Sequence, residues 1–184
     1  MDIADTNKRR KEDLFVRMFF HFGWVDGICM DILKMIKKEY MNLDLQSNTK
    51  VNVLYELTKL LDKNSVVLDF DKLLLDIRRR ESLSTTGIGF KIAIPHAKSK
   101  HIKEPAIAFG RSKKGIDFDS LDGEKAHLFF LICMPHDAGN LHLKTLAQLS
   151  RYFLHESFRT ALEQAKTEAD VLTLLEKMEA EDTR

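Results

Sequence analysis

Three side chains suited to handling phosphate stand out in this sequence: Arg80, His96 and His142. His96 directly follows Pro95, at the end of a short apolar segment, residues 92–94, that has the character of a strand. Proline fixes its own φ and biases the preceding residue towards extended geometry, so the imidazole leaves the chain at a defined point. A neutral imidazole, with an ordinary pKa of about 6.5, can attack phosphorus near pH 7. His96 is therefore the first candidate nucleophile; the alternative is a surface histidine at a strand end.

His142 and Arg80 could assist such chemistry. His142 falls in the first turn of a predicted helix that opens at Asn140. Free N–H groups in a first turn favour an anion, commonly phosphate. Arg80 closes the basic triplet 78–80 at the end of another predicted helix, and its guanidinium matches phosphate oxygens. Each has a simpler interpretation: His142 as a solvated polar residue, and the arginines as complements to the helix dipole.

Other kinds of site are poorly supported. Gly110 and Gly115 have the spacing of a P-loop, but Ile116 stands where lysine is required. His96 and His101 have no acidic partner at ligand spacing, so a zinc site is weak, and there is no His-Glu-x-x-His motif. A serine triad lacks the Gly-x-Ser-x-Gly elbow that would support it. We expect no metal and no cofactor.

Composition indicates a globular chain with no strong charge bias. It has 184 residues, 44% hydrophobic and 31% charged, with a formal net charge of +1, which argues against nucleic-acid binding through bulk charge. Cys29 and Cys133 sit among apolar residues, which favours a reduced, cytoplasmic setting. The densest apolar run, residues 128–134, is far shorter than the roughly 20 residues of a spanning helix. Residues 8–11 are basic, as in a signal peptide, but no small-residue cleavage site follows.

Hydrophobic periodicity predicts helices mixed with short strands. We expect helices with apolar positions within 51–61, 68–77, 143–153, 158–165 and 171–178, the first capped by Asn48 or Thr49 and the last by a capping box at 167–170. We expect strands at 40–45, 92–94, 106–109 and 126–134, and turns at 86–89, 115 and 122–123. Residues 12–38 suggest one broken helix or two short ones, after a disordered start. This mixture predicts an α/β sandwich around one mixed sheet.

The segment from Arg80 to His96, RESLSTTGIGFKIAIPH, resembles a known active-site signature. The EIIA type-2 family of the phosphotransferase system, with fructose, mannitol and nitrogen-regulatory members, reads roughly R-E-x-x-x-S-T-G-[IL]-G-x-x-I-A-[IV]-P-H. Residues 139–143 (GNLHL) resemble the family's second histidine segment, and 149–151 (LSR) are similar to nitrogen-regulatory members. Residues 43–50 resemble its first strand and helix start, so the resemblance covers about residues 38–180.

The resemblance implies a fold and a set of roles. The fold would be a three-layer α/β/α sandwich around a mixed, mainly five-stranded sheet, with a partly helical N-terminal extension over 1–37 and the EIIA domain over 38–184. His96 would accept a phosphoryl group from a histidine phosphocarrier protein. His142 would stabilise the transferred group, and Arg80 would face its oxygens. Such transfer depends mainly on positioning and charge stabilisation, which these residues could supply without a metal ion.

Three functions are compatible with the resemblance. We favour a nitrogen-type regulatory protein over a sugar-specific carrier that passes phosphate to a IIB domain. A pure interaction module that has lost transfer is the third, and the joint presence of Arg80, His96 and His142 counts against it. We expect a cytoplasmic protein with no nucleic-acid partner and no membrane insertion, and leave its oligomeric state open. Two departures stand out: Phe90-Lys91 replaces a pair that often ends in glycine, and residues 1–35 are unusually long and aromatic.

Overall fold

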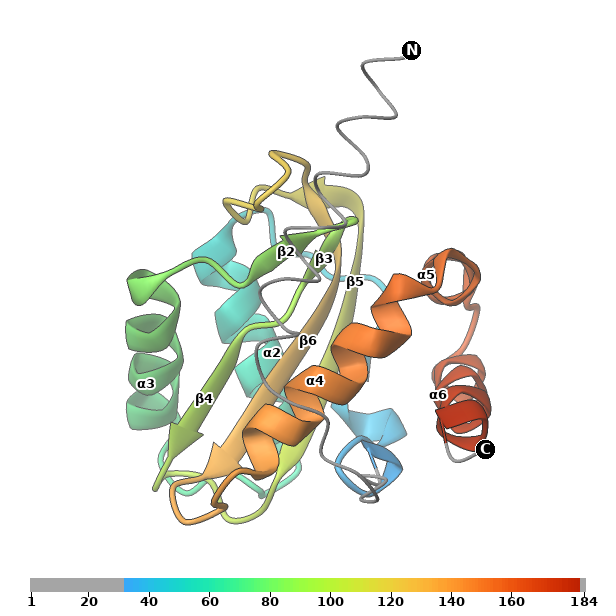
Figure 1. The fold of residues 1–184 in the computed structure, drawn as a ribbon. Coiled ribbons are helices and arrows are strands. Elements are labelled where there is room, and N and C mark those ends of the chain that lie inside the picture. Colours follow the sequence, from blue (N-terminus) through green and yellow to red (C-terminus); the bar gives the residue numbers. More distant parts are fainter. Residues whose placement is uncertain (1–31, 183–184) are drawn as a thin grey trace.

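The structure, a computed structural model, describes residues 32–182, and the expectations for residues 1–31 lie outside this range. A mixed sheet of six strands lies between two layers of helices (Figure 1). The strands are β1 (Met41–Asn42), β2 (Gly87–Gly89), β3 (Ile92–Ala93), β4 (His96–Ser99), β5 (Ala106–Ile116) and β6 (Ala126–Pro135). The helices are α2 (Lys50–Lys63), α3 (Phe70–Leu83), α4 (Leu141–Leu154), α5 (Glu156–Gln164) and α6 (Glu168–Asp182), with short 3₁₀ turns η1 (Ile32–Lys34) and η2 (Lys38–Tyr40).

The sheet has the order β1-β5-β6-β3-β2, with β4 also paired to β6. Strands β3 and β4 follow one another along the same edge of β6, with Ile92 opposite Leu128 and His96 opposite Ile132. Pro95 separates them because it has no N–H to donate, although its carbonyl still accepts the Ile132 N–H at 2.9 Å. The expected five-stranded sheet thus has six strands in five positions, and His96, which follows β3 and Pro95, also opens strand β4.

Strand β6 explains how one sheet carries two cores. Its near-continuous apolar run alternates between the two faces, as in strands covered on both sides. Leu128, Phe130, Ile132 and Met134 belong to the core with α4, α5 and α6, whereas Phe129, Leu131 and Cys133 belong to the core with α2 and α3. The predicted three-layer α/β/α arrangement is confirmed (Figure 1).

Three of the five described helices begin with a capping side chain, and α4 and α5 do not. The side chains of Thr49 and Asp69 each accept the N–H three residues on, at the starts of α2 and α3. Thr167 and Asp170 form the predicted capping box before α6, each side chain accepting the other's backbone N–H. Asn140 holds the cap position of α4, but its side chain makes no capping hydrogen bond. The side chain of Asn140 therefore satisfies none of the first-turn N–H groups of α4.

Two predicted turns are wrong. Residues 86–89 are largely strand β2, and the chain reverses one step later, at Phe90 and Lys91, whose φ angles are 54° and 64°. A two-residue hairpin loop with positive φ at both positions is a type I′ turn, which usually takes Asn-Gly. Gly115 lies inside β5, where its φ of 69° coincides with a shift in register against β6. It therefore marks a bulge, which sequence spacing alone does not distinguish from a turn.

Candidate active site

The ring of His96 has a different partner at each nitrogen. Nδ1 lies 2.9 Å from the carbonyl oxygen of Ile94, and Nε2 accepts a hydrogen bond from Nε of Arg80 at 3.0 Å. Because a carbonyl oxygen can only accept, Nδ1 must carry the proton, and Nε2 then presents its lone pair. The contacts thus assign one tautomer to His96, the one in which Nε2 could act as a nucleophile.

The surroundings of His96 also favour its neutral form. Burial is the largest cause that lowers the pKa of His96 below its ordinary value, and the positive charge of Arg80 and the neighbouring His142 ring lower it further. The Ile94 carbonyl and Glu81 act in the opposite direction but do not cancel the shift. His96 is therefore unprotonated at Nε2 near pH 7, as a nucleophile must be.

Arg80 differs from the two arginines that precede it. Arg78 and Arg79 are exposed, whereas Arg80 is half-buried in the last turn of α3. Its Nη1 donates to the carbonyl of Ser84 at 3.1 Å while its Nε donates to His96. A guanidinium has five N–H donors, so several remain to meet an anion that reaches His96. The structure brings Arg80 and His96 into contact.

His142 is the second residue of α4 and lies within electrostatic range of His96, although no hydrogen bond joins the two rings. Its Nδ1 is buried and makes no hydrogen bond to any residue within 32–182. Burial lowers the pKa of His142, the charge of Lys98 lowers it further, and the Gly139 carbonyl acts in the opposite direction. His142 is thus a neutral group with an unused polar atom beside the uncapped start of a helix.

Two residues at this site were missed in the sequence. Lys98 shares its strand face with His96, and its Nζ donates to the Gly139 carbonyl at 3.0 Å, which ties β4 to the loop before α4. Lys98 lies two residues after His96, and residues two apart on a strand share a face, so this spacing could have indicated Lys98. Glu81 follows Arg80 in the quoted signature, and it is buried and accepts two hydrogen bonds from Thr86. Glu81 continues the helical spacing of the apolar positions Leu73 and Ile77, which was the available signal for it.

The family of the chain follows from a comparison with family models. The family model described as "Phosphoenolpyruvate-dependent sugar phosphotransferase system, EIIA 2" matches residues 34–178. The chain belongs to this family.

Characterised relatives of this EIIA chain include two fructose-specific proteins. The fructose-specific EIIABC component of Bacillus subtilis is 42% identical over 146 residues, which are 79% of this chain and 23% of that protein. The fructose-specific EIIA component of Haloferax volcanii is 38% identical over 145 residues, covering 79% of this chain and 94% of that one. The chain thus spans under a quarter of the first relative and nearly all of the second.

Solved structures confirm the fold. The nitrogen regulatory protein IIA-Ntr from Neisseria meningitidis superposes with a TM-score of 0.74 at 28% identity, covering 78% of this chain and 98% of that one. The mannitol IIA of Escherichia coli superposes with a TM-score of 0.66 at 22% identity, covering 76% and 97%. The second likeness bears on the fold alone.

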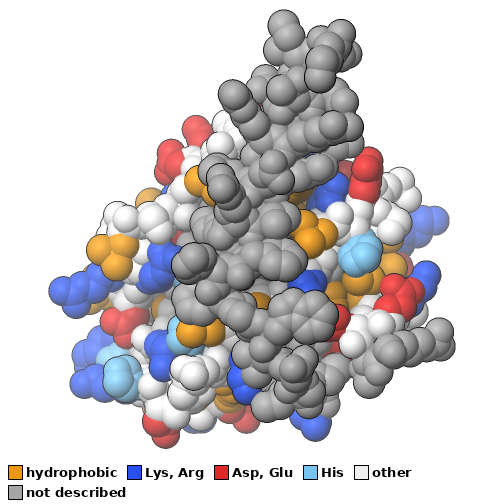
Figure 2. All heavy atoms as spheres, viewed as in Figure 1, with side chains coloured by type: hydrophobic (Ala, Val, Ile, Leu, Met, Phe, Trp, Pro, Cys, Tyr) orange, Lys and Arg blue, Asp and Glu red, His pale blue; other side chains and the backbone are white. Residues whose placement is uncertain are grey.

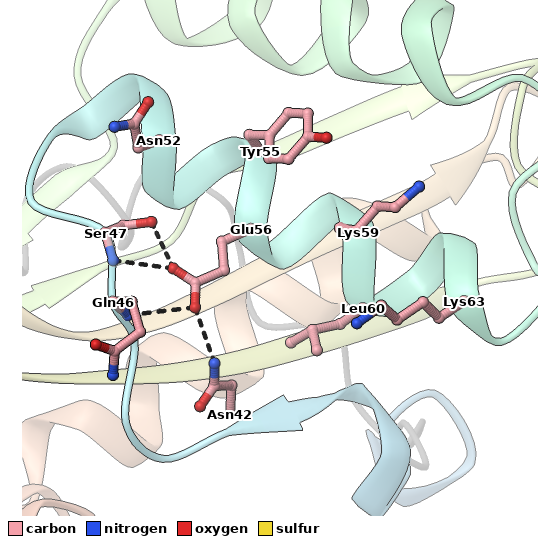
Figure 3. Close-up of a pocket in the computed structure, with 9 residues that line it drawn as sticks. All are labelled: Asn42, Gln46, Ser47, Asn52, Tyr55, Glu56, Lys59, Leu60 and Lys63. Carbon is pink, nitrogen blue, oxygen red and sulfur yellow. Dashed lines mark hydrogen bonds between the residues drawn. The ribbon is translucent and has the colours of Figure 1, made fainter.

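A hollow of about 420 Å³ lies elsewhere, along α2, and its lining does not include Arg80, His96 or His142 (Figure 3). Its carboxylate, Glu56, already accepts hydrogen bonds from Asn42, from the Gln46 N–H, and from both the N–H and the hydroxyl of Ser47. These bonds fix the chain between β1 and α2. Because Glu56 is fully engaged, we assign the hollow no part in the chemistry.

Charge and possible metal ligands were compared across the part of the EIIA chain that the structure describes. On the face in Figure 2, basic and acidic side chains are interspersed and do not form a field of one sign. Within residues 32–182, no three His, Cys, Asp or Glu side chains gather as metal ligands would. No helix in that range is both long and apolar enough to cross a bilayer. Cys133 is buried, and burial raises the pKa of its thiol.

Proposed function

We propose that this EIIA chain is a phosphoryl carrier that takes up the group on Nε2 of His96. The observation that carries the proposal is the pair of contacts on the His96 ring, Nδ1 to the Ile94 carbonyl and Nε2 to Arg80. The first fixes the tautomer, and the second places a cation where the phosphoryl oxygens would lie. A histidine on the surface for solubility alone needs neither contact.

The donor is a phosphohistidine of a histidine phosphocarrier protein. Its N–P bond breaks, the electron pair of that bond stays on the donor nitrogen, and the Nε2 lone pair of His96 forms the new N–P bond. No proton leaves His96, because Nδ1 keeps its proton on the Ile94 carbonyl throughout. Arg80 gives up its hydrogen bond to Nε2 and donates to the phosphoryl oxygens instead.

The remaining groups stabilise the charge on the transferred phosphoryl group. In the first turn of α4 the Leu141 N–H donates to the Ala138 carbonyl, whereas the N–H groups of His142 and Leu143 have no side-chain cap. Those two groups are available to an anion, and the helix dipole favours one there. His142 adds a buried Nδ1 with no hydrogen-bond partner within residues 32–182. Onward transfer is the reverse step: the Nε2–P bond breaks, and an acceptor nucleophile attacks phosphorus.

The acceptor distinguishes two roles. Identities of 42% and 38% to fructose-specific proteins support a sugar-type carrier that passes phosphate to a IIB domain. The likeness to the nitrogen regulatory IIA-Ntr, at 28% identity and a TM-score of 0.74, supports the regulatory role that the 149–151 segment favours. We take the sugar-type carrier as the first candidate and the nitrogen-type regulator as the second. Both roles place the protein in the cytoplasm.

The test is intact-protein mass spectrometry after incubation with phosphoenolpyruvate, enzyme I and the histidine phosphocarrier. We expect an acid-labile gain of one phosphoryl group, lost in His96→Ala and kept in the control His136→Ala, which removes an exposed histidine. Label retained on His96→Ala would refute the assignment. Adding a fructose-type IIB domain then separates the two roles, because only a sugar-type carrier should discharge to it rapidly.

A further inference from the structure

Glu81 forms a buried anchor one residue away from Arg80. Its side chain is 5% exposed in the last turn of α3. The carboxylate accepts the Thr86 N–H at 3.0 Å and the Thr86 hydroxyl at 2.5 Å, and it pairs with Nζ of Lys50 at 2.7 Å. Such a buried carboxylate is tolerated only while its partners hold it.

Lys50 brings two further segments to the same point. It is the first residue of α2, and its ammonium also reaches the Phe118 carbonyl at 3.3 Å and the Asp119 carboxylate at 3.1 Å. The ammonium lies 4.6 Å from the centre of the Phe118 ring. The Lys50–Glu81 pair therefore joins α2, α3, the strand that begins after Thr86, and the 117–119 loop.

Both partners of the His96 ring trace back to this anchor. The carbonyl of Thr86 accepts the Ile94 N–H at 2.9 Å, and the Ile94 carbonyl holds Nδ1 of His96. On the other side, Arg80 is the chain neighbour of Glu81 and holds Nε2. Two series of contacts, one through Thr86 and Ile94 and one through Arg80, therefore connect the Lys50–Glu81 pair to the two ring nitrogens of His96.

We infer that Lys50 and Glu81 form a positioning pair, which sets both hydrogen bonds of His96 and so fixes its ring orientation and tautomer. Neither residue touches the reacting atoms. The kinetic consequence rests on the proposed function, whereas the tautomer is measurable without any transfer. A displacement of about 1 Å at a reacting centre can cost roughly 10²-fold in rate, so losing the anchor should slow transfer strongly.

The experiment compares Lys50→Met and Glu81→Gln with a matched control, Lys59→Met, in the full chain. Lys59 lies in the same helix, pairs with Asp62 at 2.7 Å and lies 4.8 Å from the centre of the Phe70 ring. It therefore has the same two kinds of interaction as Lys50, an ion pair and a cation–π contact, at a place away from His96. Lys50→Arg is the rescue variant because it keeps the charge. The readouts are the ¹⁵N shifts of the His96 ring nitrogens, which report the tautomer, and the rate of phosphoryl acceptance at saturating carrier.

We expect Lys50→Met and Glu81→Gln to give mixed His96 tautomers and acceptance slowed by about tenfold to 10²-fold. Lys59→Met should match the wild type in both readouts, and Lys50→Arg should recover most of the rate. If Lys50→Met does not fold, Glu81→Gln decides, because it leaves no unpaired buried carboxylate. A wild-type tautomer and rate in Glu81→Gln, or an equal loss in Lys59→Met, would overturn the inference. If the wild type accepts no phosphate, the proposed function fails, and the ¹⁵N shifts still decide the positioning.

Discussion

Replacing Arg80 by lysine should damage transfer without removing the positive charge. Arg80 binds two groups at once through different nitrogens, Nε to His96 at 3.0 Å and Nη1 to the Ser84 carbonyl at 3.1 Å. The single ammonium of lysine lacks the planar fork that spans both positions. Arg80→Lys therefore keeps a cation near His96 but loses either the hydrogen bond to the Ser84 carbonyl or the hydrogen bond to His96.

The expected size follows from the number of oriented donors lost. Removing one preorganised donor from a developing charge typically costs about 2.7–4 kcal/mol, or roughly 10²–10³-fold in rate. Arg80→Lys should reduce phosphoryl acceptance by about that factor. Its fold should be unchanged, because the removed bonds lie at the half-buried end of α3 and the helix core is untouched.

The assay is rapid-quench transfer from the radiolabelled histidine phosphocarrier, with Arg79→Lys as the control on an exposed neighbour. Arg80→Gln adds a second readout: since the Arg80 charge lowers the pKa of His96, that pKa should rise in Arg80→Gln and stay near the wild-type value in Arg80→Lys. Arg80 does not have this role if Arg80→Lys transfers within about threefold of the wild type, or if Arg79→Lys is equally slow.

Three further results are expected. Because the pKa of His96 is lowered, its ring should stay neutral from pH 8 to below 6.5, and a ¹⁵N titration showing a midpoint above 6.5 would contradict the site geometry. His142→Ala should slow transfer but leave the urea midpoint almost unchanged, since its Nδ1 bonds to nothing within residues 32–182; equal transfer rates would make it a solvated residue. Arg111 Nη1 donates to the Leu162, Glu163 and Ala165 carbonyls at the end of α5. Arg111→Met should therefore lower the free energy of unfolding, measured in urea, by about 2–4 kcal/mol. A loss below about 1 kcal/mol would count against this role of Arg111.

The parts of the fold that followed from sequence are those fixed by local rules. Apolar spacing predicted the helices, Thr49 and the 167–170 box marked two of their starts, and the apolar run at 126–134 gave the central strand. These signals are local because capping and periodicity involve residues within a few positions of each other. The helices that carry Arg80 and His142 were therefore predictable, whereas strand β4, which begins at His96, was not.

What could not be predicted depends on contacts between distant segments. Gly87 illustrates this: a Cβ built there would lie 2.7 Å from the Ser120 hydroxyl and 2.9 Å from the Ser120 Cα, so the residue is needed for close packing rather than for a turn. The Lys50–Glu81 pair joins residues 31 positions apart in the chain, and no periodicity signals it. The hydrogen bond from Arg80 to Nε2 of His96 likewise exists only once α3 meets β4.

The Phe90-Lys91 pair, which departs from the family pattern, shows how packing replaces local chemistry. A type I′ turn disfavours side chains at both positions, so these two residues need external support. That support comes from α5: the Arg159 guanidinium lies 4.7 Å from the centre of the Phe90 ring, and Lys91 pairs with Glu163 at 3.3 Å. Strand β3 and Pro95 separate this turn from His96 along the chain. The departure therefore changes how the hairpin is fastened to the α5 layer, and the residues that hold the His96 ring are left as the signature has them.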